Sequence, residues 1–280
     1  MKSSVILLIS LVSLILIFPN IQIVKGVFTG DIHGNTYINE DGSIEPSDAP
    51  IQRTGEIFTI TDDFHGYHLR IERSDIIVDG NGFTLYQSII LHHVSNVIIK
   101  NFFINNPEGS GIDLDHSPNN TITNNTIWEC GAVDSTMGAW GASIFIHGED
   151  SNRVYGNFIK NNLVGVIVYG SPNTVFYDNV FADNQFDVSD FAGLGFGTVP
   201  SIARFDNGER GNYWDSYSGN DTNNDGIGDE SYIIDENNVD KYPLISPADI
   251  PEFPSWTILP LFLIFTLIGV LIKKRISLLN

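Results

Sequence analysis

One stretch near the C-terminal end carries the residues of a calcium-binding loop. Calcium needs many flexible oxygen ligands, and Gly226 would allow the sharp turn that such a loop makes. Position twelve is Tyr232 instead of a bidentate Glu, so a further carboxylate must complete the set: Glu230, Asp235 or Asp240. The predicted ligands are Asp221, Asn223, Asp225, the carbonyl oxygen of Ile227, and Asp229. The alternative is an acidic turn with solvated carboxylates and no ion.

A second set of candidate residues lies upstream and mixes carboxylates, an imidazole and aromatic rings. Rings stack on sugars and carboxylates bind hydroxyls, so this set predicts a glycan-binding face. Carboxylates of the same region, with Glu149, could instead supply the acid and base of glycoside hydrolysis. A third interpretation makes the segment 131–140 a lid over an apolar surface. The residues of the predicted face are Asp113, Asp115, Trp140, His147 and Tyr169.

Three histidines of the same region allow a copper hypothesis. Imidazole is a good copper ligand, and His92, His116 and His147 are available. In the repeat of this region, His92 and His116 fall in equivalent positions of successive coils, and His147 is one position away from theirs. A copper-handling role therefore stays open beside the glycan-binding one.

A repeat between Ser88 and Asn184 positions these candidates. Its intervals, about 22 to 32 residues, are typical of solenoids. One apolar column contains Ser88, Ile112, Ile144 and Val166, and the next contains Ile90, Leu114, Ile146 and Val168. Two further columns are rich in Asn: Asn96, Asn120, Asn152 and Thr174, then Asn101, Asn125, Asn157 and Asn179.

The columns predict an all-β fold, a single-stranded right-handed parallel β-helix. Apolar side chains would point inward, and Asn would occupy the corners, where it tolerates left-handed backbone and bonds to its equivalent one coil away. The outward column would contain Leu91, Asp115, His147 and Tyr169, as near neighbours. A chance run of Asn-rich turns between ordinary strands is the alternative.

Both ends of the chain indicate export. Residues 1–26 have the early Lys2, apolar run and small residues of a signal peptide, or of an uncleaved N-terminal anchor. Residues 257–275 form an apolar segment with a basic end, preceded by a linker at 251–256. This pattern predicts a transmembrane anchor that leaves the bulk of the chain outside the membrane.

The segment between the ends is strongly acidic. The whole chain has 14 Lys and Arg against 34 Asp and Glu, a net charge of −20, which excludes nucleic acid as a partner. The single Cys130 cannot form an internal disulfide. We divide this segment into cap strands at 27–74, coils at 75–204 and a C-terminal acidic module at 205–250.

Several motifs carry a resemblance to a known family. The run from Asp79 to Gly82, the run from Gly211 to Asp215, the acidic loop and the run from Asn238 to Leu244 resemble NosD-type right-handed β-helices of archaeal surface proteins. The resemblance implies the fold, export and an association with carbohydrates or, for the namesake, maturation of a periplasmic copper enzyme. It supplies no catalytic residues. The C-terminal tail also resembles sortase-type sorting signals.

These observations favour a membrane-anchored surface module that binds glycans or cell-envelope partners. An enzyme that cleaves glycans is the first alternative, and a copper-handling accessory factor is the second.

Overall fold

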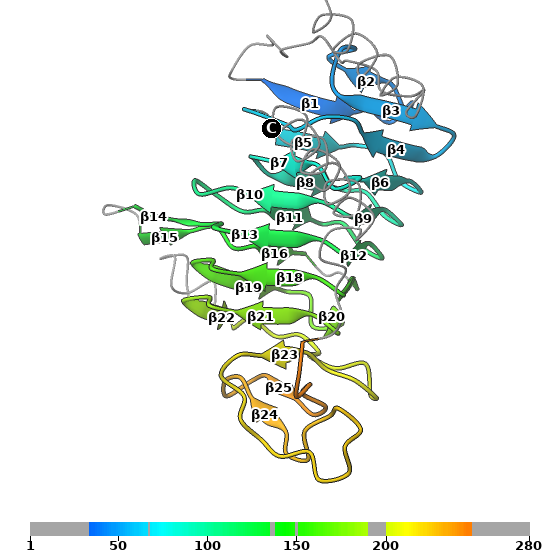
Figure 1. The fold of residues 1–280 in the computed structure, drawn as a ribbon. Helices are drawn as coiled ribbons and strands as arrows, with labels where there is room; N and C mark the ends of the chain where they lie inside the picture. Colours follow the sequence, from blue (N-terminus) through cyan, green and yellow to red (C-terminus); the bar gives the residue numbers. More distant parts are fainter. Residues whose placement is uncertain (1–33, 67, 135–137, 149–150, 190–199, 248–280) are drawn as a thin grey trace, which may run out of the picture. The chain divides into compact units, whose positions relative to one another are not determined.

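The computed structural model describes residues 34–66, 68–134, 138–148, 151–189 and 200–247, with only the backbone of residues 132–134 and 138–140. All described residues belong to one compact unit that begins at Ile32. Most of the strands form three sheets whose members stack coil upon coil, as Figure 1 shows. The all-β parallel architecture predicted from the repeat is thereby confirmed.

Each sheet collects one strand from successive coils. Sheet A contains, in spatial order, β2 (Ile44–Glu45), β1 (Asn35–Ile38), β5 (His68–Ile71), β8 (Ile89–His92), β11 (Ile112–Asp115), β16 (Ile144–His147), β19 (Val164–Tyr169) and β22 (Phe186–Val188). Sheet B contains β20 (Val175–Tyr177), β17 (Arg153–Tyr155), β12 (Thr121–Thr123), β9 (Ile98–Lys100), β6 (Ile77–Asp79), β4 (Ile57–Ile60) and β3 (Ile51–Thr54). Sheet C contains β23 (Tyr213–Trp214), β21 (Val180–Ala182), β18 (Phe158–Lys160), β13 (Thr126–Trp128), β10 (Phe103–Asn105) and β7 (Thr84–Leu85).

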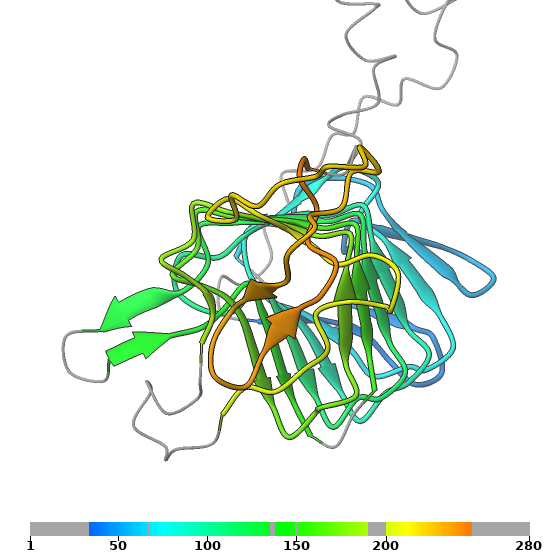
Figure 2. The ribbon, with the colours of Figure 1, turned by 90° about the horizontal axis from the view of Figure 1, so that it is seen from below.

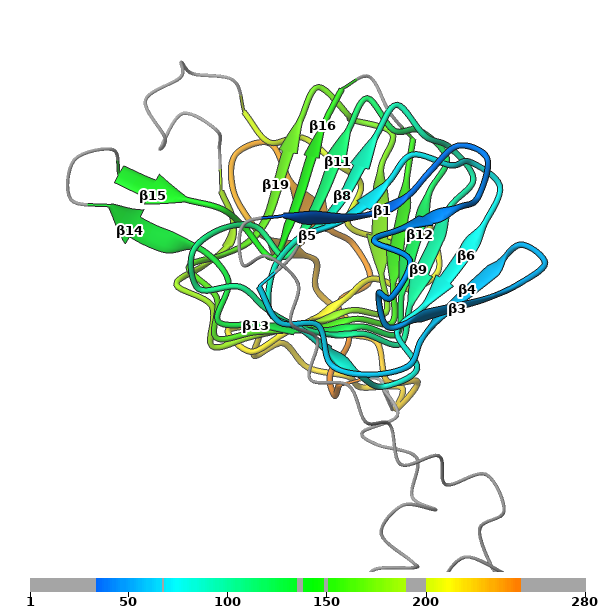
Figure 3. The same ribbon diagram turned by 90° about the horizontal axis from the view of Figure 1, so that it is seen from above.

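Two antiparallel hairpins stand apart from the sheets. One pairs β14 (Ala132–Asp134) with β15 (Gly138–Trp140), and the other pairs β24 (Tyr232–Ile233) with β25 (Val239–Asp240). Figures 2 and 3 both show β14 and β15 projecting sideways from the coils. The described strands of the long insertion in the third coil therefore form a hairpin that extends away from the stack. A lid formed by side chains of this insertion stays a prediction.

The register between the first two full coils differs by one residue from the sequence alignment. Ile112 pairs with Ile89, and Ile122 pairs with Ile99, so the interval there is one residue shorter than predicted. The cause is a doubled asparagine: Asn119-Asn120 and Asn124-Asn125 each offer two candidates for one column. The later intervals, from β11 to β16 and from β16 to β19, are as predicted.

The two members of each doublet have different tasks. The first has left-handed backbone, with φ of 59° at Asn119 and 55° at Asn124, as Asn96 and Asn101 do one coil earlier. Asn tolerates this conformation better than most residues because its short polar side chain can bond locally. The second member is buried and forms the ladder. Asn96 and Asn101 thus belong to the left-handed columns beside the ladder.

Buried asparagines connect the coils through a hydrogen-bond ladder. The Asn157 Oδ1 atom accepts from the backbone N–H and the side-chain amide of Asn125, both at 3.0 Å. The Asn157 amide donates to the Ile122 carbonyl oxygen at 2.9 Å and to Asn179 Oδ1 at 2.9 Å. Because buried backbone groups need partners, each rung satisfies an amide that no strand reaches. The ladder continues through Asn212.

Apolar side chains from all three sheets fill the interior. Ile, Leu, Val and Phe residues from every coil form one continuous cluster of buried side chains. Cys130 lies in this cluster, and burial raises the pKa of its thiol to about 12, so it is inert at neutral pH. A second, small cluster lies outside the main core: Ala142, Val164, Ile167, Phe145 and Leu163.

The C-terminal end of the ladder is closed by a carboxylate. Asp240 is fully buried, and its Oδ2 atom accepts from the Asn212 backbone N–H at 2.7 Å and from Trp214 Nε1 at 2.9 Å. Burial raises the pKa of Asp240 to about 6, although these hydrogen bonds favour the ionised form. Asp240 is therefore committed to the end of the core and does not complete a calcium loop.

The predicted segments at the two ends of the chain lie outside the described residues. This applies to the signal peptide at 1–26, the linker at 251–256 and the anchor at 257–275. Within the part of the chain that the structure describes, no helix is long and apolar enough to cross a bilayer.

We expect Asn157→Ala to lower the free energy of unfolding by about 3 kcal/mol, because it leaves buried partners of the Asn157 amide unpaired. Urea unfolding would measure the loss. Arg153→Ala, an exposed change in the same coil, is the matched control and should stay within about 0.5 kcal/mol of the parent. Equal, small effects of both changes would contradict a stabilising ladder.

We expect Asp240→Asn to reduce the pH dependence of stability between about pH 4 and pH 6. The folded-state pKa exceeds the ordinary value of 3.8, so the proton on Asp240 stabilises the fold at low pH. That contribution, about 3 kcal/mol for the shift to about 6, is lost as the pH rises through the folded pKa. Urea unfolding at about pH 4.5 and pH 7 should show a larger loss for the parent than for the variant. Equal losses of unfolding free energy in the parent and the variant would contradict a raised pKa of Asp240.

Candidate metal-binding site on the outer face of sheet A

The outward residues at the ends of four adjacent strands form one column. His92 pairs with Asp115, Asp115 with His147, and His147 with Tyr169 along β8, β11, β16 and β19. The predicted adjacency of Asp115, His147 and Tyr169 is confirmed. The first member is His92 instead of Leu91, because the register of that coil is shifted by one residue. Leu91 is buried in the core.

Asp115 is the centre of the column. Its Oδ1 atom lies 3.2 Å from His147 Nδ1 and 2.5 Å from His116 Nδ1, and its Oδ2 atom lies 3.2 Å from His92 Nε2. Three imidazoles from three coils therefore surround one carboxylate. The side chains are accessible: the exposed fraction is 48% for His92, 61% for His116 and 27% for His147.

The neighbouring outward column adds a second carboxylate. Asp113 pairs with Phe145, and Phe145 with Ile167. Asp113 Oδ1 lies 3.2 Å from His147 Nε2, in an orientation that makes no hydrogen bond, and this buried oxygen accepts none among the described residues. The His147 ring stacks on Phe145 at a centroid distance of 4.9 Å, which fixes the plane of the imidazole between the two carboxylates.

Two histidines occupy the corner that follows these strands. His93 and His116 have left-handed backbone, with φ of 56° and 47°, and their rings lie 5.3 Å apart. The copper hypothesis placed His92 and His116 in one column, and this is corrected: His116 shares its column with His93, and His92 shares the column of Asp115. His92 and Asp115 are each the last residue of a strand, and His93 and His116 each follow directly. This shared position at the strand ends is the sequence signal for the pairing.

The imidazoles favour the ionised form of the central carboxylate. Burial alone would raise the pKa of Asp115, but the hydrogen bond with His116 and the charges of the His147, His116 and His92 rings bring it below the ordinary value. Asp115 is thus an anion available as a ligand at neutral pH.

The cluster has the donors of a transition-metal site. One ligand atom from each of Asp115, His116 and His147 lies within 4.8 Å of the others, and among the described residues this is the one such group of three. Nitrogen and oxygen donors together suit Cu(II), Ni(II) and Zn(II). Asp113 lies beside the other ring nitrogen of His147 and can orient that imidazole. These residues therefore fit a copper ion.

The remaining predicted residues of the face are less informative. Tyr169 is 39% exposed at the end of the column. Trp140 ends β15, but its side chain lies outside the described part of the structure, as does all of Glu149. A binding role for Trp140 and an acid–base role for Glu149 stay predictions.

In the acidic loop at 221–229, side-chain oxygens accept hydrogen bonds from backbone N–H groups of the same loop. Asp221 Oδ2 accepts from the Gly226 N–H at 2.9 Å, and Asp225 Oδ1 accepts from the Ile227 N–H at 2.9 Å. Gly226 has a φ of 84°, which supports the predicted sharp turn. Asn223 and Asp229 also accept backbone N–H groups of the loop.

Comparison with known proteins identifies the family. The family model described as periplasmic copper-binding protein (NosD) matches residues 19–219, which is most of the chain. The chain belongs to the NosD family. The resemblance noted in the sequence is thereby confirmed at the level of the family, and the His and Asp cluster lies within the matched NosD region.

Two curated NosD relatives also match. Both are described as probable ABC transporter binding protein NosD. The protein from Stutzerimonas stutzeri is 29% identical over 133 residues, covering 45% of this chain and 29% of the relative. The protein from Pseudomonas aeruginosa is 28% identical over 135 residues, covering 46% and 30%. The chain thus matches less than a third of the length of these NosD relatives.

Proposed function

We propose that this protein is an extracytoplasmic copper-binding module of the NosD family. The observation that carries the proposal is the group formed by Asp115, His116 and His147, whose ligand atoms lie within 4.8 Å of one another on an accessible face. The description of the family as periplasmic and copper-binding supports it. The apolar segment at 257–275 would hold the module at the membrane, with the coils outside.

The chain's own residues would divide the work of binding. His116 and His147 supply nitrogen donors, and Asp115 supplies a carboxylate oxygen whose negative charge offsets that of the cation. Phe145 and Asp113 act on His147, through ring stacking and charge, and hold it in place. A bound Cu(II) ion would supply a redox-active centre on an otherwise inert solenoid.

A glycan-binding role is the second candidate, favoured by the exposed ring of Tyr169 beside the polar column. Aromatic rings and carboxylates of this face could hold a neutral sugar. However, the Asp115 carboxylate already faces three imidazoles at 2.5 to 3.2 Å, which leaves it fewer free acceptors for hydroxyls. The metal role therefore uses the observed geometry more fully.

We also propose that the loop at 221–229 binds calcium as a structural clip at the C-terminal end of the coils. Its ligands would be Asp221, Asn223, Asp225, Asp229 and the Ile227 carbonyl. Since Asp240 is buried in the ladder, Glu230 or Asp235 would supply any further carboxylate.

We expect His116→Asn combined with His147→Asn to weaken Cu²⁺ binding by more than about 100-fold, since loss of outer-shell partners alone costs 10–100-fold. Isothermal titration of metal-free protein would give the Kd. Tyr169→Ala is the matched control, because it changes the same column without removing a nitrogen donor, and it should leave the Kd unchanged. An unchanged Kd in the double variant would contradict the site. Glycan retention abolished by Tyr169→Ala would favour the second candidate.

We expect calcium to raise the Tm by about 5–10 °C at roughly one hundred times its Kd, from the linkage of binding to folding. Asp221→Asn with Asp225→Asn should abolish this rise. Glu209→Gln with Glu236→Gln removes two exposed charges elsewhere and should preserve it. A rise that survives the loop substitutions would show that the loop is not the site.

A further inference from the structure

The two oxygens of the Asp115 carboxylate face different partners. Oδ1 lies beside His116 and His147, whereas Oδ2 lies 3.2 Å from His92 Nε2. A carboxylate can bind one metal ion through each oxygen. Two donor atoms bound to one ion at about 2.1 Å lie roughly 3 Å apart, so the separation of His92 Nε2 and Asp115 Oδ2 suits a shared ion.

The column continues beyond His92 to another carboxylate. Ile71 at the end of β5 pairs with Leu91, so Glu72 is the next residue in line with His92 one coil further. Glu72 is exposed, and its backbone N–H is fixed by a 2.9 Å hydrogen bond to the Ile38 carbonyl oxygen. Since neighbouring strands are about 4.8 Å apart, Glu72 and Asp115 flank His92 on either side.

A hollow opens at this point of the face. It has a volume of about 390 Å³, and its walls include two histidines and two glutamates, with Arg73. The Arg73 guanidinium donates hydrogen bonds to Glu56 Oε2 and to the Glu40 carbonyl oxygen, both at 2.8 Å. The residues that line the hollow are Glu40, Glu72, Arg73, Ser74, His92, His93 and Val94.

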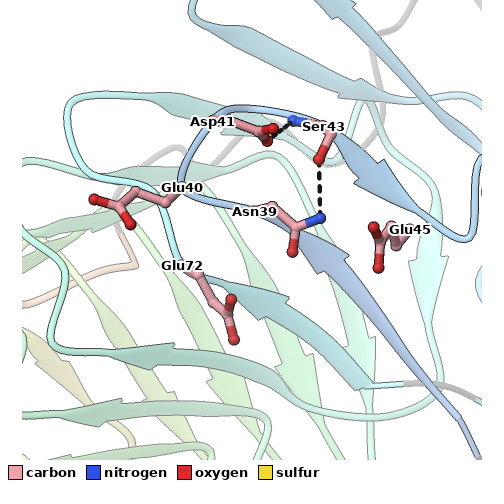
Figure 4. A pocket seen from close by; sticks show the side chains of 6 residues that line it. All are labelled: Asn39, Glu40, Asp41, Ser43, Glu45 and Glu72. Carbon is pink, nitrogen blue, oxygen red and sulfur yellow. Dashed lines mark hydrogen bonds between the residues drawn. The ribbon is translucent and has the colours of Figure 1, made fainter.

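A second hollow, drawn in Figure 4, shares Glu40 and Glu72 with the first. Asp41 and Glu45 also line it. The acidic walls extend the negative field from the cap strands to His92, and they would raise the local concentration of divalent cations.

We infer that this face binds two divalent transition-metal ions, with Asp115 bridging them. The first ion occupies the proposed copper site, on which this inference rests. The second is held by His92 Nε2, Asp115 Oδ2 and the Glu72 carboxylate, at the edge of the hollow lined by His93. Two-metal sites in proteins have separations of about 3.5–4 Å, a spacing that a single bridging carboxylate supports.

Stepwise loading of the intact metal-free protein with Cu²⁺ tests the inference. The bound metal is counted after desalting, and electron paramagnetic resonance reports whether the ions interact. The parent should hold two equivalents, and the second should produce a spin-coupled, half-field signal. His92→Asn should hold one equivalent with the spectrum of an isolated ion. Glu72→Gln should weaken the second equivalent by about tenfold or more and leave the first unchanged.

A histidine outside the cluster gives the matched control. His65 is exposed and stacks on Tyr86, and His65→Asn should retain both equivalents and the coupled signal. One equivalent with an isolated spectrum in the parent would overturn the second site and leave the proposed function intact. No tight binding in the parent would overturn both. Two equivalents retained in His92→Asn, with an unchanged melting temperature, would also overturn the second site.

Discussion

At the corners of each coil, a backbone N–H points into the interior where no strand can receive it. An amide of the next coil accepts it: Asn120 Oδ1 accepts the Val97 N–H at 2.8 Å, and Asn152 Oδ1 accepts the Asn120 N–H at 2.8 Å. An unpaired buried amide costs about 1–3 kcal/mol, so a slipped coil would lose several such contacts at once. The ladder therefore fixes the register in which the coils stack.

The register in turn creates the outer face. In a strand, a shift of one residue moves every side chain to the opposite face. Once Asn125 Oδ1 receives the Phe102 N–H, His92 stands beside Asp115, and Leu91 enters the core. Side chains from three different coils then meet around the Asp115 carboxylate. The site is thus a consequence of the core's hydrogen bonds, and needs no special loop of its own.

The residues of the cluster lie partly on paired strands and partly at exposed corners. His92, Asp115 and His147 end strands of sheet A, whose pairing holds them at a fixed spacing. His93 and His116 lie at left-handed corners and are exposed. The proposed site thus combines groups from paired strands with an imidazole from a corner.

Sequence alone determined the architecture and the later columns of the outer face. The Asn and apolar columns predicted the parallel coils, because inward positions must be apolar and corners must tolerate left-handed backbone. The same columns predicted that Asp115, His147 and Tyr169 are neighbours. The tertiary structure decided which member of each Asn doublet enters the ladder, since both are asparagine and only burial distinguishes them. That choice brought His92 to Asp115 and paired His93 with His116. It also decided that Asp240 ends the core, because a carboxylate's role depends on which N–H groups surround it, and Asn212 and Trp214 are far from Asp240 in the sequence.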